Sequence, residues 1–224
     1  MKKIIQTLQQ NERLSVVISL SITSALSVFL VFFRVYQTKM PIYVFLIWNL
    51  ILATIPYVIG LYLFSKRREN FKSFKYIILF FLWLIFLPNA PYILTDLIHL
   101  RIREGFPLVL DLIILLFYAW TGLMMCLYSI KDLQQIIQLK YGKKWSMLFT
   151  LTIPFICAFG VYIGRFLRYN SWDFVFNFDS VAKDILKHIV FPHQHVEAVT
   201  ITFLLGSFIL VAYYSLELNK KVAE

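Results

Sequence analysis

Long apolar stretches alternate with short polar segments along the whole of this 224-residue chain. A helix that crosses the hydrocarbon core of a bilayer needs about 20 predominantly apolar residues. The pattern predicts six such helices, the third shorter than the others, at residues 14–33, 40–64, 74–87, 108–130, 145–163 and 197–216. The sequence therefore predicts an all-α, polytopic membrane protein in which residues 1–224 form a single membrane domain.

Two further segments, residues 91–103 and 180–190, have one apolar and one polar face at helical spacing. The first follows the sequence LPNAPY at residues 87–92, where each proline removes an amide donor and clashes with the carbonyl group four residues earlier. We expect the third helix to break there and Asn89 to cap a new helix, and we expect Ser180 to cap the second segment. Both amphipathic segments fit helices that lie along the membrane surface, and the first also fits a helix that re-enters the bundle.

The composition agrees with a membrane protein. With 60% hydrophobic residues, 15% charged residues and a mean hydropathy of +0.73, the chain would expose much apolar surface as a soluble globule. The net charge of +10 comes from basic residues beside the apolar stretches, where they set orientation, and nucleic-acid binding is therefore not predicted. Of the 22 Lys and Arg residues, fourteen fall on one side in alternate loops and eight on the other, which predicts that both termini are cytoplasmic.

The two cysteines fall inside predicted helices, Cys126 near the inner end of the fourth and Cys157 in the middle of the fifth. At 1.5 Å per residue their depths differ by roughly 10 Å. A disulfide between them is therefore not expected.

The predicted topology brings two distant groups of polar residues to the same outer face of the membrane. One group follows the break at Pro88, and the other follows the fifth helix. Their side chains could converge into one polar site. The candidate ligand-binding residues are Asn89, Asp96, His99, Asp111, Arg165, Arg168, Asn170 and Asp173.

Within this set, Arg165 and Arg168 are three residues apart, so one helical turn would project both guanidinium groups the same way. Such a pair suits bidentate binding of a phosphate or carboxylate. The alternative is that the arginines pair with Asp96, Asp111 or Asp173 and anchor the helix end. A carboxylate such as Asp111 is costly at membrane depth, so it is predicted either to pair with an arginine or to handle protons.

Metal binding is an alternative for part of this set. Asp96 and His99 have a three-residue spacing that lets one helix offer two ligands, and His193 and His195 could add to them. However, these residues form no specific zinc signature. No metal and no other cofactor is therefore predicted.

The segments LPNAPYILTDL at residues 87–97 and GRFLRYNSWD at residues 164–173 resemble the two signatures of an uncharacterised bacterial membrane-protein family, DUF1361. The similarity extends over nearly the whole chain, and Tyr169 stands where the family pattern has tryptophan. The resemblance implies a location in the bacterial plasma membrane. It supplies no activity, cofactor or catalytic residue.

Three hypotheses for function follow from these features. The first is that the protein binds or transports an anionic solute or lipid headgroup at the outer polar site, because broken helices at polar sites are typical of membrane transport folds. The second is a membrane-embedded enzyme acting on an envelope lipid or glycan, with Asp96, His99 or Asp173 as acid, base or metal ligand. The third is a non-catalytic accessory subunit that docks a protein partner, which the sequence does not identify. Membrane lipids are expected partners in every case.

Overall fold

The computed structural model describes residues 13–69, 73–102 and 105–222. The described chain is predominantly helical, and six described segments are long and apolar enough to cross a membrane, which confirms the predicted all-α membrane fold. In chain order the helices are α2 (Arg13–Thr38), α3 (Phe45–Ser65), α4 (Phe74–Phe86), α5 (Asn89–Tyr92), η1 (Ile93–His99), α6 (Leu108–Tyr141), α7 (Lys143–Arg165), α8 (Asp173–Phe176), α9 (Phe178–Val190), η2 (Pro192–Gln194) and α10 (Val196–Val222).

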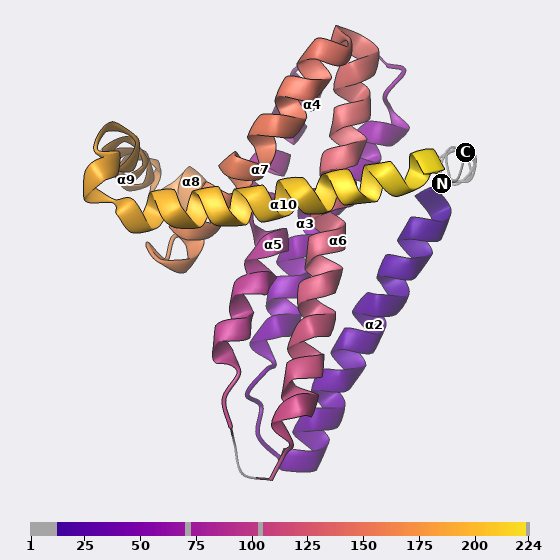
Figure 1. Ribbon diagram of the computed structural model, residues 1–224, viewed down its shortest axis with the longest axis vertical. Coiled ribbons are helices and arrows are strands. Elements are labelled where there is room, and N and C mark those ends of the chain that lie inside the picture. The colour runs from indigo at the N-terminus through magenta and orange to yellow at the C-terminus, as the bar shows by residue number, and fades with distance from the viewer. Residues whose placement is uncertain (1–12, 70–72, 103–104, 223–224) are drawn as a thin grey trace.

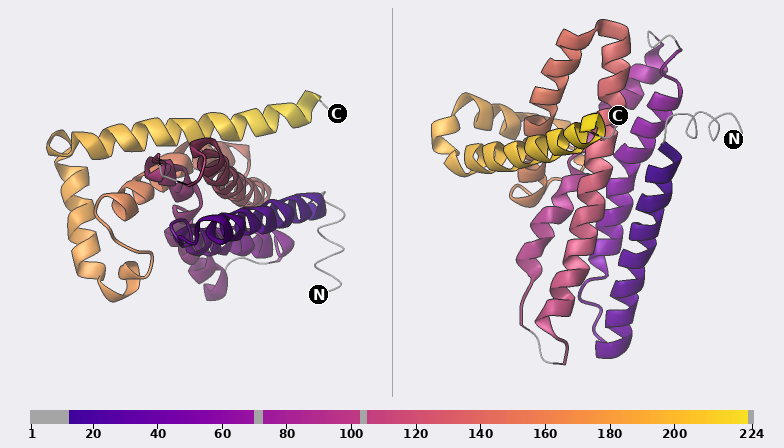
Figure 2. Two further views of the ribbon diagram at one scale, coloured as in Figure 1. Left: turned by 90° about the horizontal axis from the view of Figure 1, so that it is seen from below. Right: turned by 45° about the vertical axis from the view of Figure 1, so that its right-hand side comes forward.

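The helices form a bundle with one crossing element. Figure 1 shows α2, α3 and α6 running along the long axis of the molecule, and α10 lying across it. The view from below in Figure 2 agrees, because α10 is seen there along its full length. It packs mainly on α7, while α8 and α9 lie to one side of the bundle at the start of α10.

Two buried ion pairs join the antiparallel helices α2 and α6. Arg13 contacts Asp132 at 2.5 Å, and Arg34 contacts Asp111 at 2.6 Å. The two arginines are 21 positions apart along α2, and the two aspartates are 21 positions apart along α6. At 1.5 Å per residue both intervals are about 31 Å long, close to the thickness of the hydrocarbon core of a bilayer. The two pairs therefore mark the ends of a mainly apolar span.

The break after α4 differs from the prediction. The chain turns at Leu87 and Pro88 and then stays helical through α5 and η1, which pack against α3 and α6. Asn89 makes no side-chain cap, since its amide donates to the preceding Phe86 carbonyl. Of the two alternatives expected for this segment, the structure agrees with a helix inside the bundle and not with one on the membrane surface, because η1 packs on α6 and Asp96 is buried.

Two glycines lie where the broken segment packs against α6 and α7. A Cβ atom added at Gly122 of α6 would lie 2.4 Å from the Ala90 carbonyl oxygen, and one added at Gly160 of α7 would lie 2.3 Å from Pro88 Cγ. Neither distance is possible for a real side chain. The close approach of the PNAP segment to α6 and α7 therefore depends on the absence of a side chain at both positions.

Other element boundaries also differ from those predicted. The fourth span continues past residue 130 to Tyr141, because the charges of Lys131 and Asp132 are paired with Glu217 and Arg13 and do not end the helix. The second amphipathic helix, α9, begins at Phe178, so that Ser180 lies inside it and is not its cap. Cys126 and Cys157 are buried free thiols that lie close enough to interact across α6 and α7, so the expected difference in depth is wrong.

Candidate functional site

The two polar segments that follow Pro88 and α7 meet in the structure. The Asn89 amide nitrogen donates to the Ser171 hydroxyl at 2.8 Å and to the Phe86 carbonyl at 2.9 Å. The Ser171 hydroxyl in turn faces the Ile85 carbonyl at 3.5 Å. Because the break disturbs the hydrogen bonding of the last turn of α4, these side chains supply donors to carbonyl groups there. The Ser171 side chain of the loop after α7 therefore helps to satisfy the last carbonyl groups of α4.

A second link between the two segments is an ion pair. The Arg165 guanidinium contacts the Asp96 carboxylate, donates to the Thr95 hydroxyl at 2.9 Å, and lies 4.3 Å from the centre of the Tyr92 ring. The Asn49 amide donates to the other Asp96 oxygen at 2.8 Å. The side chains of Asp96 and Arg165 are 1% and 14% exposed, respectively. The two charges compensate each other, so Arg165 is engaged within the protein.

The remaining predicted residues of the first group have different environments. The His99 ring nitrogen lies 4.0 Å from Asp96, with its side chain partly exposed. Asp111 is paired with Arg34, and the Tyr43 hydroxyl lies 3.3 Å from its second oxygen. Its partner is therefore an arginine of α2 and neither of the two arginines proposed from the sequence. Arg34 directly follows the apolar run of residues 14–33 and therefore resembles a loop residue in the sequence, although a cation at a helix end is a usual partner for a buried carboxylate.

The residues of the second group do not form one cluster of charges. Arg168 is exposed, has a φ of 61°, and makes no hydrogen bond or ion pair with another described residue. Asp173 accepts hydrogen bonds from the Asn170 backbone amide and the Asn177 side chain, each at 2.7 Å. The hydrogen bond from the Asn170 amide, followed by that from Asn177, lowers the pKa of Asp173 below its ordinary value. Asp173 thus organises the loop locally.

The weak metal candidates are not assembled into a site. His195 stacks on His188 with ring centres 3.8 Å apart, and His193 packs its ring edge-on against Phe191. Across residues 13–69, 73–102 and 105–222, no three His, Cys, Asp or Glu side chains are grouped closely enough to hold a metal ion. Asp96 and His99 therefore gain no third ligand.

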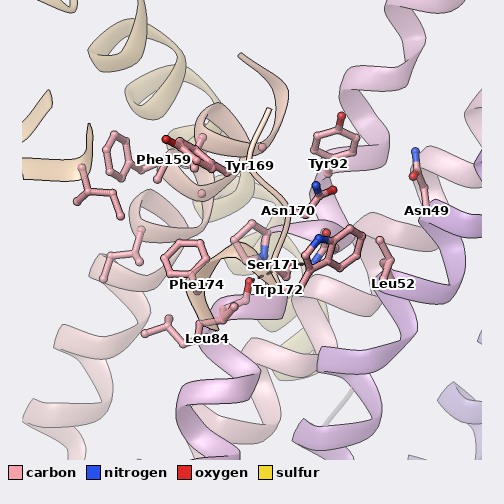
Figure 3. Close-up of a pocket in the computed structure, with 18 of the residues that line it drawn as sticks. Asn49, Leu52, Leu84, Tyr92, Phe159, Tyr169, Asn170, Ser171, Trp172 and Phe174 are labelled. Atoms are coloured by element: carbon pink, nitrogen blue, oxygen red, sulfur yellow. Dashed lines mark hydrogen bonds between the residues drawn. The ribbon is translucent and has the colours of Figure 1, made fainter. Parts of the chain in front are cut away.

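A cavity of about 610 Å³ lies beside the point where the two segments meet. Figure 3 shows the labelled residues of the loop, from Tyr169 to Phe174, between Phe159 on one side and Asn49 and Leu52 on the other. Most of the wall is apolar and comes from α3, α4, α7 and α9. On α7 the lining runs from Phe155 to Gly164, a face about 13 Å long at 1.5 Å per residue.

The polar part of the cavity wall is neutral. It consists of the side chains of Asn49, Asn89, Tyr92, Tyr169, Asn170, Ser171 and Trp172. Among the described lining residues there is no carboxylate, imidazole, lysine or arginine. The Asp96–Arg165 pair lies behind Asn49 and Tyr92, which contact it and also line the cavity. Sequence analysis missed the aromatic lining at Trp48, Phe155 and Phe159, because apolar residues of a span give no signal of where a cavity opens.

Residues 48–212 match the family described as "Protein of unknown function (DUF1361)", a range that includes both polar segments and most of the bundle. No curated protein and no solved structure matches the chain. The match covers well over half of the sequence, and the chain therefore belongs to the DUF1361 family of proteins of unknown function.

Proposed function

We propose that this protein binds a membrane lipid in the cavity beside Pro88, with the hydrocarbon part along α7 and the polar part at Asn170 and Ser171. The observation that carries the proposal is the cavity itself. It has a volume of about 610 Å³, a mostly apolar wall, and neutral hydrogen-bonding groups on the loop after α7. A pocket of this size with few, well-placed polar groups is the usual form of a small-molecule site.

The distribution of charge favours an amphiphile over a small soluble anion. Arg165, the arginine first suspected of binding an anion, is compensated by Asp96 and contributes no charge to the cavity wall. The described cation nearest in sequence to the polar lining is Arg168, which directly precedes Tyr169 and is exposed. An anionic headgroup would therefore be held by Arg168 at the mouth, while its hydrocarbon chain occupies the apolar wall.

The same lining favours binding over catalysis. General acid–base chemistry needs a titratable group within hydrogen-bonding reach of the substrate. The titratable side chains in the described wall are the phenols of Tyr92 and Tyr169, and the Tyr169 hydroxyl donates a hydrogen bond to the Asp184 carboxylate at 2.8 Å. Among the described residues, the hydrogen-bond partners of the Ser171 hydroxyl are the Asn89 amide and the Ile85 carbonyl, and neither is a base. The helix broken at Pro88 beside the cavity is a feature that transport proteins share.

A filling substitution tests the proposal. Ile156 lines the cavity and is 48% exposed, so Ile156→Trp places a larger side chain in it without removing a buried group. Leu151→Trp is the matched control, since Leu151 is exposed on the same helix and lines neither described cavity. The proteins are placed in nanodiscs with a phospholipid that carries a photoactivatable acyl chain, and the labelled peptides are identified by mass spectrometry.

We expect wild type and Leu151→Trp to be labelled at residues 169–174, and Ile156→Trp to lose that labelling while Phe208, exposed on α10, is labelled equally in all three. Arg168→Gln should lower the preference for an anionic over a zwitterionic probe about five-fold, since a basic residue near an anionic surface contributes about 1 kcal/mol. The matched charge control is Lys183→Gln on α9. Equal labelling of residues 169–174 in the Ile156→Trp and Leu151→Trp proteins would contradict the proposal.

A further inference from the structure

A second cavity, of about 630 Å³ and called the groove below, lies at the other end of α7. Its wall is formed by α3, α4, α6 and α7 and is largely apolar, with Ile77, Phe80, Ile137 and Leu148 among the lining residues. Tyr141 and Trp145 line the part of the wall where α6 turns into α7. The cavity is separate from the one beside Pro88, because the two share no lining residue.

Basic residues surround the end of this cavity at the turn between α6 and α7. Lys140 lines the cavity and donates a hydrogen bond to the Glu69 carbonyl at 2.6 Å. The turn after α3, which contains Glu69, therefore lies next to the turn between α6 and α7. Lys143 and Lys144 lie between the lining residues Tyr141 and Trp145, and both are exposed. Lys75 directly precedes the lining residue Tyr76.

The acid within this group does not balance the lysines. Glu69 pairs with Lys66 at 2.7 Å and accepts a hydrogen bond from the Tyr76 hydroxyl. The hydrogen bond from Lys66 lowers the pKa of Glu69, so its carboxylate is ionised at neutral pH and is already engaged by one lysine. The first turn of α7 carries Lys143 and Lys144 and no acidic residue. A positive potential therefore remains where the groove opens.

We propose that this groove binds a phospholipid with an anionic headgroup, with an acyl chain against Ile77, Phe80 and Leu148 and the phosphate beside Lys140, Lys143 and Lys144. The apolar wall requires a hydrocarbon chain, and the lysines require a negative charge. A soluble phosphate would leave the wall uncovered, and a zwitterionic lipid would gain little from the lysines. The basic loops predict that this end is cytoplasmic, the side on which anionic lipids give the membrane a negative surface potential.

Competitive lipid retention tests the proposal. Protein reconstituted with equal amounts of phosphatidylglycerol and phosphatidylcholine is released into detergent, and the lipid adducts are counted by native mass spectrometry. We expect wild type to retain phosphatidylglycerol preferentially. In the double variant Lys143→Gln, Lys144→Gln the ratio of retained phosphatidylglycerol to phosphatidylcholine should fall about ten-fold. Each lysine near an anionic surface contributes a factor of about five, and exposure to solvent reduces the combined effect.

Two matched controls separate the site from general charge and general apolarity. Lys183→Gln, Lys187→Gln removes the same charge from α9 and should leave the preference unchanged. Ile77→Trp blocks the groove and should lower the preference as strongly as the Lys143→Gln, Lys144→Gln variant, whereas Ile78→Trp, at an equally exposed position that does not line the groove, should not. Ile156→Trp, which fills the cavity beside Pro88, removes the lipid retained there, so the loss of preference caused by Lys143→Gln, Lys144→Gln should also be seen in an Ile156→Trp background.

Three results would overturn the proposal. Equal retention of both lipids by wild type would show that no anionic lipid is selected. An equal loss in the α9 double variant would show that net charge alone is responsible. Loss on removing the two lysines with no loss in Ile77→Trp would show that a surface anion site exists without a bound acyl chain.

Discussion

At the scale of single residues, three aspartates of similar expected cost are buried in the bundle and receive different partners. Asp96 is held by Arg165 and Asn49, Asp111 by Arg34, and Asp132 by Arg13. Removing one member of a buried ion pair leaves an uncompensated charge and costs about 3–5 kcal/mol, far more than the pair contributes when it is intact. The pairing therefore decides which single substitutions the fold tolerates.

The Asp96–Arg165 pair makes this testable. Asp96→Asn and Arg165→Gln are each expected to lower the free energy of unfolding by about 3–5 kcal/mol, because each leaves the other charge buried. The double variant should be more stable than the sum of the two losses predicts, by at least about 1 kcal/mol, because no lone charge remains. Unfolding in mixed micelles, followed by circular dichroism, measures all four proteins. Strict additivity would show that the two side chains are not coupled.

At the scale of elements, the spans could be predicted from the sequence, because an apolar run of sufficient length is a local signal. The end of α6 could not be predicted, since Lys131 and Asp132 resemble a loop until their partners Glu217 and Arg13 are known. The convergence of the segments after Pro88 and Gly164 followed from topology alone. The sequence could not show which side chains pair, because Arg165 and Arg168 lie one helical turn apart and either could have faced Asp96. In the structure only Arg165 does so.

The packing of the broken helix on α7 gives a prediction with an internal control. Gly160→Ala should destabilise the protein by about 1–3 kcal/mol, because its Cβ would overlap the rigid Pro88 ring. At Gly164, one turn later on α7, an added Cβ would meet its nearest neighbour at an ordinary 3.5 Å. Gly164→Ala should therefore be neutral, or stabilising by up to about 1 kcal/mol through helix propensity. Thermal denaturation in detergent distinguishes them, and equal effects would show that Pro88 is free to move.

At the scale of the whole molecule, the protein consists of a helical bundle and a peripheral arm, which is formed by the loop after α7 together with α8 and α9. Helices α2, α3 and α6 run together along the long axis, whereas α8 and α9 lie to one side and are followed by α10, which packs mainly on α7 (Figure 1). The cavity beside Pro88 takes its wall from both parts, with Ile185 and Ile189 of α9 facing residues of α3, α4 and α7. The Asn89–Ser171 hydrogen bond joins the loop after α7 to the broken helix, and the Tyr169–Asp184 hydrogen bond joins the same loop to α9.

The spacing of the two ion pairs between α2 and α6 predicts a dependence on bilayer thickness. Stability should be greatest in bilayers with a hydrocarbon core of about 31 Å and should fall by fractions of a kcal/mol per Å on either side. Unfolding measured in phosphatidylcholines of increasing chain length tests this. The double variant Arg34→Met, Asp111→Leu, which removes one pair together, should show a flatter profile. A wild-type stability that changes in one direction only across the series would contradict the prediction.

The equal spacing of these two pairs also fixes the register of α2 on α6. If α2 slid along its neighbour by a single turn, about 5.4 Å, Arg13 and Arg34 would lose their aspartates simultaneously. Rotation of α2 about its own axis would separate them in the same way. The two pairs therefore hold α2 and α6 in a single register, and a movement of one helix along the other would have to break both pairs together.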